Sequence, residues 1–247
     1  MVSGNLIQVS PRFRLDLSNS LITSTRSDEG VYSFDSKRAA RLIFQDRMEG
    51  WFFTPAKNLL DDNHVMAAIG IVTPLIESLQ VYKSGKPKAN FTEGAKKIFQ
   101  YLCQKDRKHF SKKHCPRCTS EGNELCKKPI DLLHQGVRCG LAHQGFLQKA
   151  DDRLGKNRII ISSRRNSFPI IYEASEMTIY APSYIDAIKN AFDEYYIELE
   201  NSIDRESEVY TSEISINFMK IWDMNWNTKK NSFKVTMEEL PDHSYPI

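Results

Sequence analysis

Apolar residues recur at helical intervals in the first half of the chain, and this pattern constrains the fold more than any other feature. It runs at intervals of four, three, four and three through Val65, Ile69, Val72, Ile76 and Leu79. Such spacing places all five side chains on one face of an α-helix. The sequence therefore predicts a long buried helix from about residue 57 to residue 82, bent at Pro74 because proline has no backbone N–H to donate.

Other segments also have helical periodicity. We expect helices from Ser36 to Gly50, from about Thr92, from about Lys128 to Ala142, and from Ser183, where Asp186 would form a variant of the capping box. The helix at 128–142 has an apolar stripe made of Ile130, Leu133, Val137 and Leu141, and the helix from Ser183 has one made of Ile185, Ile188, Phe192, Tyr195 and Leu199. These elements predict a mainly α protein built as a helical bundle.

Little β-structure is expected. Residues 158–162 and 167–172 flank Arg164-Arg-Asn and predict a small β-hairpin, with Pro169 on an edge strand. Residues 1–35 read as an irregular N-terminal arm with one short strand at 13–17, because serine, asparagine and threonine are frequent there. Residues 36–203 form the predicted helical domain. Residues 204–247 form an extension packed on the bundle, whose pattern fits either a helix or a strand.

The 247-residue chain contains 40% hydrophobic and 26% charged residues, which fits one globular domain with an appendage. The uncharged run from Val65 to Ile76 is shorter than the roughly 20 residues of a spanning helix. The first residues lack a basic head followed by an apolar run, so no secretion signal is predicted. We therefore expect a cytoplasmic protein without a membrane helix.

Charge is strongly segregated although the net charge is only +3. Residues 83–117 contain eleven Lys or Arg and two acids, a local charge of +9, whereas residues 173–213 contain eleven acids and two bases, a local charge of −9. Clustered cations gain free energy by releasing counterions from phosphate, so the basic segment suggests a polyanionic partner. A solvated helix face with no partner is the alternative reading.

The sharpest motif lies at the end of the helix predicted at 128–142. It reads Val137-Arg-Cys-Gly-Leu-Ala-His-Gln-Gly and places Arg138 five positions before His143. A guanidinium suits phosphate oxygens, and an imidazole exchanges protons near neutral pH. On an unbroken α-helix, however, side chains five residues apart point about 140° away from each other. Either the helix unwinds near Gly140, or a second copy of the chain supplies the other half of the site.

This motif, at the end of a helix in a helical bundle, resembles the R-x4-H motif of the HEPN superfamily (higher eukaryotes and prokaryotes nucleotide-binding). The order of the apolar helix, the Phe-Thr-Glu-Gly-Ala-Lys-Lys-Ile-Phe segment, the hairpin and the helix from Ser183 extends the likeness over roughly residues 36 to 203. The resemblance implies a homodimer formed through the motif helices and a metal-independent endoribonuclease. Enzymes of this type serve in toxin–antitoxin, antiphage and RNA-processing systems, so an antitoxin or a defence-complex partner is also implied.

The resemblance also assigns roles. His143 would act as base on the ribose 2′-hydroxyl or as acid on the leaving 5′-oxygen, and Arg138 would hold the scissile phosphate. The products would carry 2′,3′-cyclic phosphate and 5′-hydroxyl ends, and no cofactor would be required. The residue after the arginine is often Asn, Asp or His in active members, whereas this chain has Cys139, a poor hydrogen-bond partner.

Supporting residues follow from position. Asp131 or His134 could orient Arg138 in place of Cys139, or form an ordinary polar flank, and Gln144 follows the histidine directly. The candidate RNA-binding residues are Lys96, Lys97, Lys105, Lys108, Lys112, Lys113, Arg164 and Arg165.

A second constellation has metal-ligating chemistry. His114, Cys115, Cys118 and Cys126 could complete a tetrahedral zinc site, since Pro116 favours a turn between the two nearest cysteines. The spacing is not that of a standard zinc finger, and free thiols packed as small apolar groups are the alternative.

Three functions therefore remain open. The first is a HEPN-like endoribonuclease, the second is a HEPN-like module that binds RNA, a nucleotide or a partner protein without cutting, and the third is a dimeric scaffold in a defence complex. In the third, the acidic residues 173–213 would bind a basic partner.

Overall fold

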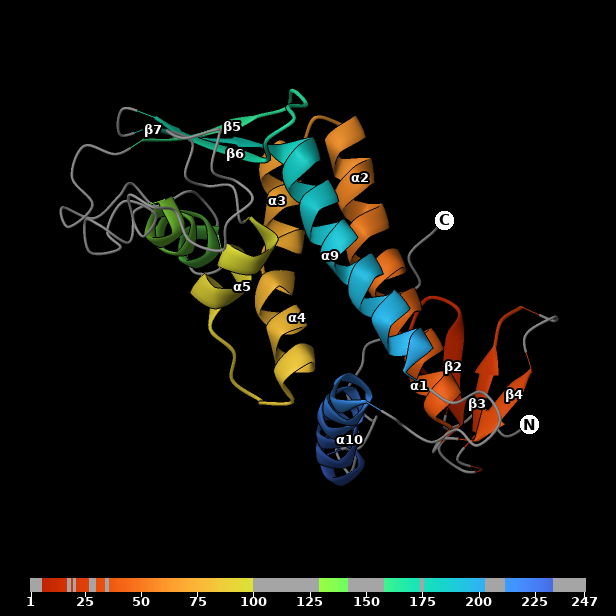
Figure 1. The fold of residues 1–247 in the computed structure, drawn as a ribbon. Coiled ribbons are helices and arrows are strands. Elements are labelled where there is room, and N and C mark those ends of the chain that lie inside the picture. Colours follow the sequence, from red (N-terminus) through yellow and green to blue (C-terminus); the bar gives the residue numbers. More distant parts are fainter. Residues whose placement is uncertain are drawn as a thin grey trace.

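The computed structural model describes residues 6–16, 19, 21–26, 30–33, 36–99, 129–141, 158–173, 176–202 and 212–232, with side chains up to residue 224. The helices are α1 (Lys37–Arg47), η1 (Met48–Phe53), α2 (Thr54–Asp61), α3 (Val65–Val72), α4 (Leu75–Ser84), α5 (Phe91–Ile98), η2 (Leu133–Cys139), α9 (Ala181–Asn201) and α10 (Glu213–Ser232). The strands are β1 (Leu6–Gln8), β2 (Phe13–Asp16), β3 (Leu21–Ser24), β4 (Val31–Ser33), β5 (Arg158–Ser162), β6 (Ile170–Glu173) and β7 (Glu176–Tyr180). The chain is mainly helical, as predicted (Figure 1).

The first helix is longer than the sequence suggests. The Ser36 side chain accepts the Ala39 N–H and caps α1, as expected. The helix then continues through the π-helix η1 into α2 and does not end at Gly50, so that prediction was wrong. Gly50 serves a packing purpose: a Cβ placed there would lie 2.3 Å from Cγ of Pro11. The glycine therefore lets the N-terminal sheet approach the helix.

The apolar run folds into two helices, α3 and α4, preceded by a separate α2. A turn at residues 62–64, where Asn63 has a φ of 62°, ends α2 and corrects the predicted start near residue 57. The chain bends between Val72 and Leu75, which confirms the predicted break at Pro74. Residues 65–84 have the length and mean hydropathy (1.5) of a membrane-spanning helix, and 44% of that window is buried within the fold. A core helix passes the same test.

Helix α9 provides the centre of the core. The predicted stripe on α9 is confirmed, because all five of its apolar residues are buried. Phe192 and Tyr195 of α9 meet the ring of Phe44 from α1 at centroid distances of 6.1 Å, and Phe218 of α10 meets it at 5.4 Å. The predicted cap at Ser183 was wrong. Helix α9 begins at Ala181, and the Ser183 hydroxyl instead donates to the carbonyl of Asn166 and accepts the Asn166 N–H.

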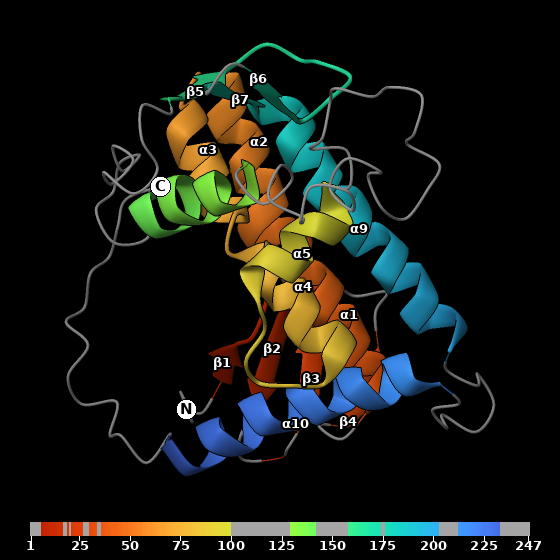
Figure 2. The ribbon, with the colours of Figure 1, turned by 60° about the vertical axis from the view of Figure 1, so that its left-hand side comes forward.

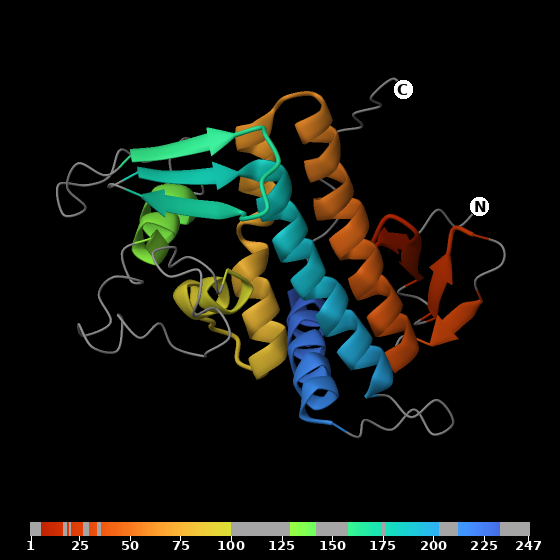
Figure 3. The same cartoon turned by 45° about the horizontal axis from the view of Figure 1, so that its top comes forward.

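The N-terminal segment was predicted as an irregular arm, and this was wrong. Residues 6–33 form a four-stranded antiparallel sheet in the order β1-β2-β3-β4. Its inner face buries Phe13, Leu15 and Ile22. The strands are three or four residues long, so their alternation is too short to stand out from the sequence. Figure 3 shows this sheet at the α1 end of the bundle.

The second sheet has the order β5-β7-β6 and also corrects a prediction. The expected hairpin of residues 158–162 with 167–172 does not form, because β7 lies between the two strands. Strand β5 pairs parallel to β7, and β6 pairs antiparallel to β7. Strand β7 was not predicted from the sequence. It buries Met177 and Ile179.

The ambiguous C-terminal segment contains the helix α10. Its Phe218 and Trp222 are buried, and α10 crosses the end of α4 opposite the motif (Figure 2). The Asn217 side-chain amide donates to the carbonyl of Lys83 at 3.0 Å. Gly85 ends α4 with a φ of 64°, the left-handed conformation that favours glycine. Helix α10 therefore helps to cap α4.

Candidate functional site

The helix that carries the motif spans residues 129–141, and we name it the motif helix. Its predicted apolar stripe is confirmed at Ile130, Leu133 and Val137, which are buried. The segment Leu133–Cys139 is wound as a π-helix, η2. A π-helix takes about 4.4 residues per turn, so side chains five residues apart lie roughly 50° apart. Consistent with this, Sγ of Cys139 lies 3.9 Å from Nε2 of His134.

Three neighbouring helices hold the motif helix in place. The ring of Phe91 on α5 stacks on His134 at a centroid distance of 5.3 Å. A Cβ placed at Gly70 of α3 would lie 3.9 Å from Cδ1 of Leu141, so the two helices touch there. The third contact joins Arg138 to α4. The motif helix therefore spans the surface formed by α3, α4 and α5 (Figure 2).

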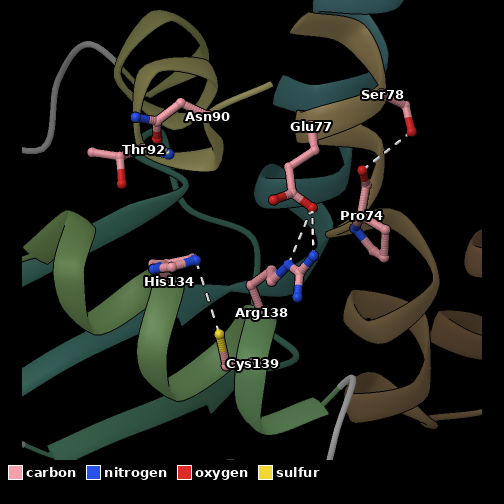
Figure 4. A network of polar contacts seen from close by, with 8 residues as sticks. All are labelled: Pro74, Glu77, Ser78, Asn90, Thr92, His134, Arg138 and Cys139. Atoms are coloured by element: carbon pink, nitrogen blue, oxygen red, sulfur yellow. Dashed lines mark hydrogen bonds and ion pairs between the residues drawn. The ribbon is translucent and has the colours of Figure 1, made fainter. Parts of the chain in front are cut away.

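Arg138 is bound by Glu77 of α4. Nε and Nη2 of Arg138 both donate to Oε2 of Glu77, at 3.1 and 2.8 Å (Figure 4). The side chains are 28% and 25% exposed, respectively. The hydrogen bond to Glu77 is the largest of the effects that raise the pKa of Arg138 above its usual value. Arg138 is thus a permanent cation at the surface. Glu77 accepts hydrogen bonds from the Nε–Nη2 edge of its guanidinium.

Glu77 was not anticipated from the sequence. Asp131 and His134 were the residues considered for orienting Arg138, but the hydrogen bonds to its guanidinium come from Glu77, and His134 faces Phe91 and Cys139. A signal was available. Glu77 is the one Asp, Glu, Lys or Arg in residues 65–82. A charge in an otherwise apolar helix requires a partner.

Several predicted residues lie outside the described part of the chain. They are His143, Gln144, Lys105, Lys108, Lys112, Lys113, His114, Cys115, Cys118 and Cys126. Both the second half of the motif and the zinc hypothesis therefore stay predictions. Among the described residues, no group of three or more His, Cys, Asp or Glu is placed to hold a metal ion.

The predicted RNA-binding residues that lie in the described part of the chain fall in two places. Lys96 and Lys97 are exposed on α5, the helix that packs against the motif helix, and Lys97 donates to Oε1 of Gln80 at 3.0 Å. Arg165 forms an ion pair with Asp186 of α9, while Arg164 is exposed. The turn that carries both arginines is therefore fastened to α9, at the end of the sheet away from the motif helix (Figure 3).

A cavity of about 440 Å³ lies elsewhere, between α1, η1, α9 and the N-terminal sheet. Its floor includes the rings of Phe44, Phe53 and Phe192. Arg12 binds Asp46 at 2.6 Å, and Lys189 binds both Glu49 and Asp193 at 3.1 Å. These charged groups form ion pairs with one another, so the cavity is a weaker candidate for a functional site than the surface at Arg138.

No family model matches this chain, and no curated protein or solved structure matches it. Functional inference therefore depends on the geometry of the motif helix and its neighbours.

Proposed function

We propose that this protein is a metal-independent endoribonuclease of the HEPN type, with Arg138 and His143 as catalytic residues. The observation that carries the proposal is the π winding of the motif helix. Arg138 lies within η2, and the contact between His134 and Cys139 shows that side chains five apart meet on this helix. Arg138 and His143 have the same separation. η2 ends at Cys139 and Gly140 and Leu141 are α-helical, so the winding departs from the α-helical geometry that would direct them about 140° apart only at the Arg138 end of the motif.

The chemistry follows from the two groups. His143 removes the proton from the 2′-hydroxyl, the 2′-oxygen attacks phosphorus, and the bond to the 5′-oxygen breaks as that oxygen takes a proton from the protonated His143. The products carry a 2′,3′-cyclic phosphate and a 5′-hydroxyl. Arg138 binds the non-bridging oxygens, whose negative charge grows in the transition state. Its permanent charge supports this role.

The placement of the basic segment supports RNA as the partner. Residues 83–117 carry a charge of +9, and α5, which lies within this segment, packs directly on the motif helix through Phe91 and His134. Lys96 and Lys97 therefore lie on the helix that packs against the motif helix, which carries Arg138. A homodimer through the motif helices would bring two such surfaces together. A role in toxin–antitoxin or antiphage defence, in the cytoplasm, is part of the same proposal.

The test uses purified full-length protein and a mixed-sequence RNA oligonucleotide in the presence of chelator. We expect fragments with 2′,3′-cyclic phosphate and 5′-hydroxyl ends. Arg138→Ala should lower the rate about 10²–10³-fold and His143→Ala about 10²–10⁴-fold, as expected for loss of an electrostatic stabiliser and of an acid–base group. Exposed residues provide matched controls, Arg14→Ala and His64→Ala. Equal cleavage by wild type and His143→Ala would remove this assignment.

Two observations favour a second function, a module that binds RNA, a nucleotide or a protein without cutting it. Arg138 already has a carboxylate partner in Glu77, and the residue that follows it is the weak hydrogen-bond partner Cys139. Such a module would bind RNA with an affinity that falls as salt rises, and it would produce no fragments. A dimeric scaffold would neither bind RNA nor cleave it.

A further inference from the structure

We propose that Glu77 is the positioning residue of this site, supplying from α4 the carboxylate that accepts hydrogen bonds from Arg138. The inference rests on the proposed ribonuclease function and adds a residue to its machinery. It starts from the observation that Nε and Nη2 of Arg138 both donate to Oε2 of Glu77.

The geometry leaves one edge of the guanidinium for a phosphate. Nε and Nη2 bind Glu77, whereas Nη1 is not among the atoms that Glu77 contacts. A guanidinium is planar, so fixing one edge also fixes the direction of the other donors. Glu77 therefore sets the orientation in which Arg138 would meet an oxyanion.

Glu77 is itself held firmly. It lies in the first turn of α4, directly after the bend at Pro74. Its neighbours Leu75 and Ile76 are buried at 2% and 0% exposure, which fixes the start of α4 against the core. The N-terminal turn of a helix favours a negative charge. The carboxylate is therefore presented from a rigid element, as an orienting group requires.

Two opposite roles for Glu77 predict different kinetics. A positioning carboxylate raises the rate of the bound complex but repels RNA slightly, so its removal should lower kcat without raising KM. A carboxylate that merely competes with phosphate for Arg138 would not raise the rate of the bound complex. Its removal would leave kcat unchanged or raise it. The partial burial of the pair, at 25% and 28% exposure, favours the positioning role because the contact is partly shielded from water.

The experiment compares Glu77→Gln and Glu77→Ala with Asp61→Asn, an exposed acid of α2 outside the basic segment. We expect kcat to fall about 10–100-fold in both Glu77 variants, the usual range for a residue that orients a functional group, with KM unchanged or lower. Formate, a small carboxylate, should restore part of the activity of Glu77→Ala and leave Glu77→Gln unaffected. Asp61→Asn should match wild type. Thermal unfolding of each variant checks that the fold persists. Glu77→Gln keeps nearly the wild-type side-chain shape, so it still tests the inference if Glu77→Ala does not fold.

The two hypotheses fail in different ways. If wild type cleaves RNA and Arg138→Ala does not, but both Glu77 variants retain wild-type kcat, the positioning role is overturned and the ribonuclease remains. If wild type shows no cleavage, the ribonuclease fails and the role of Glu77 fails with it. If kcat rises in Glu77→Gln, Glu77 is a competitor for Arg138 and the inference is likewise overturned.

Discussion

Replacing Gly50 with alanine tests the close contact between the N-terminal sheet and the first helix. In a helix interior, glycine to alanine normally stabilises by about 1 kcal/mol, because alanine has the higher helix propensity. At Gly50 the new Cβ would lie 2.3 Å from Cγ, 3.2 Å from Cβ and 3.4 Å from Cδ of Pro11. The proline ring is rigid, so the sheet must shift, and overpacking of this kind costs roughly 1–3 kcal/mol. The cost of the clash exceeds the propensity gain over most of its range, and we expect a net loss of up to about 2 kcal/mol.

Gly70→Ala is the matched control. It lies in α3, and the nearest atom to its new Cβ would be Cδ1 of Leu141 at 3.9 Å, an ordinary contact. This variant should gain about 0.5–1 kcal/mol. Urea unfolding followed by circular dichroism measures both changes as shifts in midpoint at constant slope. Equal gains in the two variants would refute the contact with Pro11. Failure of Pro11→Ala to relieve the defect of Gly50→Ala would refute it as well.

The buried tyrosines and one buried acid give four further predictions. Burial raises the pKa of both Tyr184 and Tyr195. Above about pH 10 the unfolded chain loses protons that the folded chain keeps, so unfolding free energy should fall there, and less steeply in either Tyr→Phe variant. At neutral pH, Tyr184→Phe should cost about 0.5–1.5 kcal/mol, since its hydroxyl lies 3.2 Å from Thr73 Oγ1, which itself donates to a backbone carbonyl. Tyr195→Phe should be neutral or stabilising by up to about 1 kcal/mol, because its hydroxyl has no hydrogen-bond partner among the described residues. Asp46→Ala should cost roughly 2–3 kcal/mol in urea unfolding, since Asp46 accepts from both the backbone N–H and Nε of Arg12; a loss below about 0.5 kcal/mol would contradict this.

The helices were predictable where their apolar residues repeat over several turns. The stripes of α9 and of the motif helix, and the bend at Pro74, follow from periodicity and from the chemistry of proline. The helix was predicted to end at Gly50 because a glycine that ends a helix and a glycine that allows a neighbour to approach look alike in sequence. The N-terminal strands were missed because each is only three or four residues long.

The site was predictable only in part. The motif identified Arg138, but its partner Glu77 is 61 residues away along the chain, and no local spacing connects the two. The π winding of η2 was also not predictable, because 3.6-residue periodicity already accounts for its buried residues. The strand order of the second sheet was predicted wrongly for a similar reason: β7 lies between β5 and β6, which are consecutive in sequence, and this pairing depends on tertiary contacts.

The contact of α10 with α4 bears on where this chain can be shortened. A truncation before residue 213 would strip the amide of Asn217 from the Lys83 carbonyl and uncover the aromatic faces of Phe44 and Tyr82, which Phe218 covers at centroid distances of 5.4 and 5.6 Å. A fragment cut there should bind hydrophobic dyes and aggregate. The last described helix is thus an integral part of the domain.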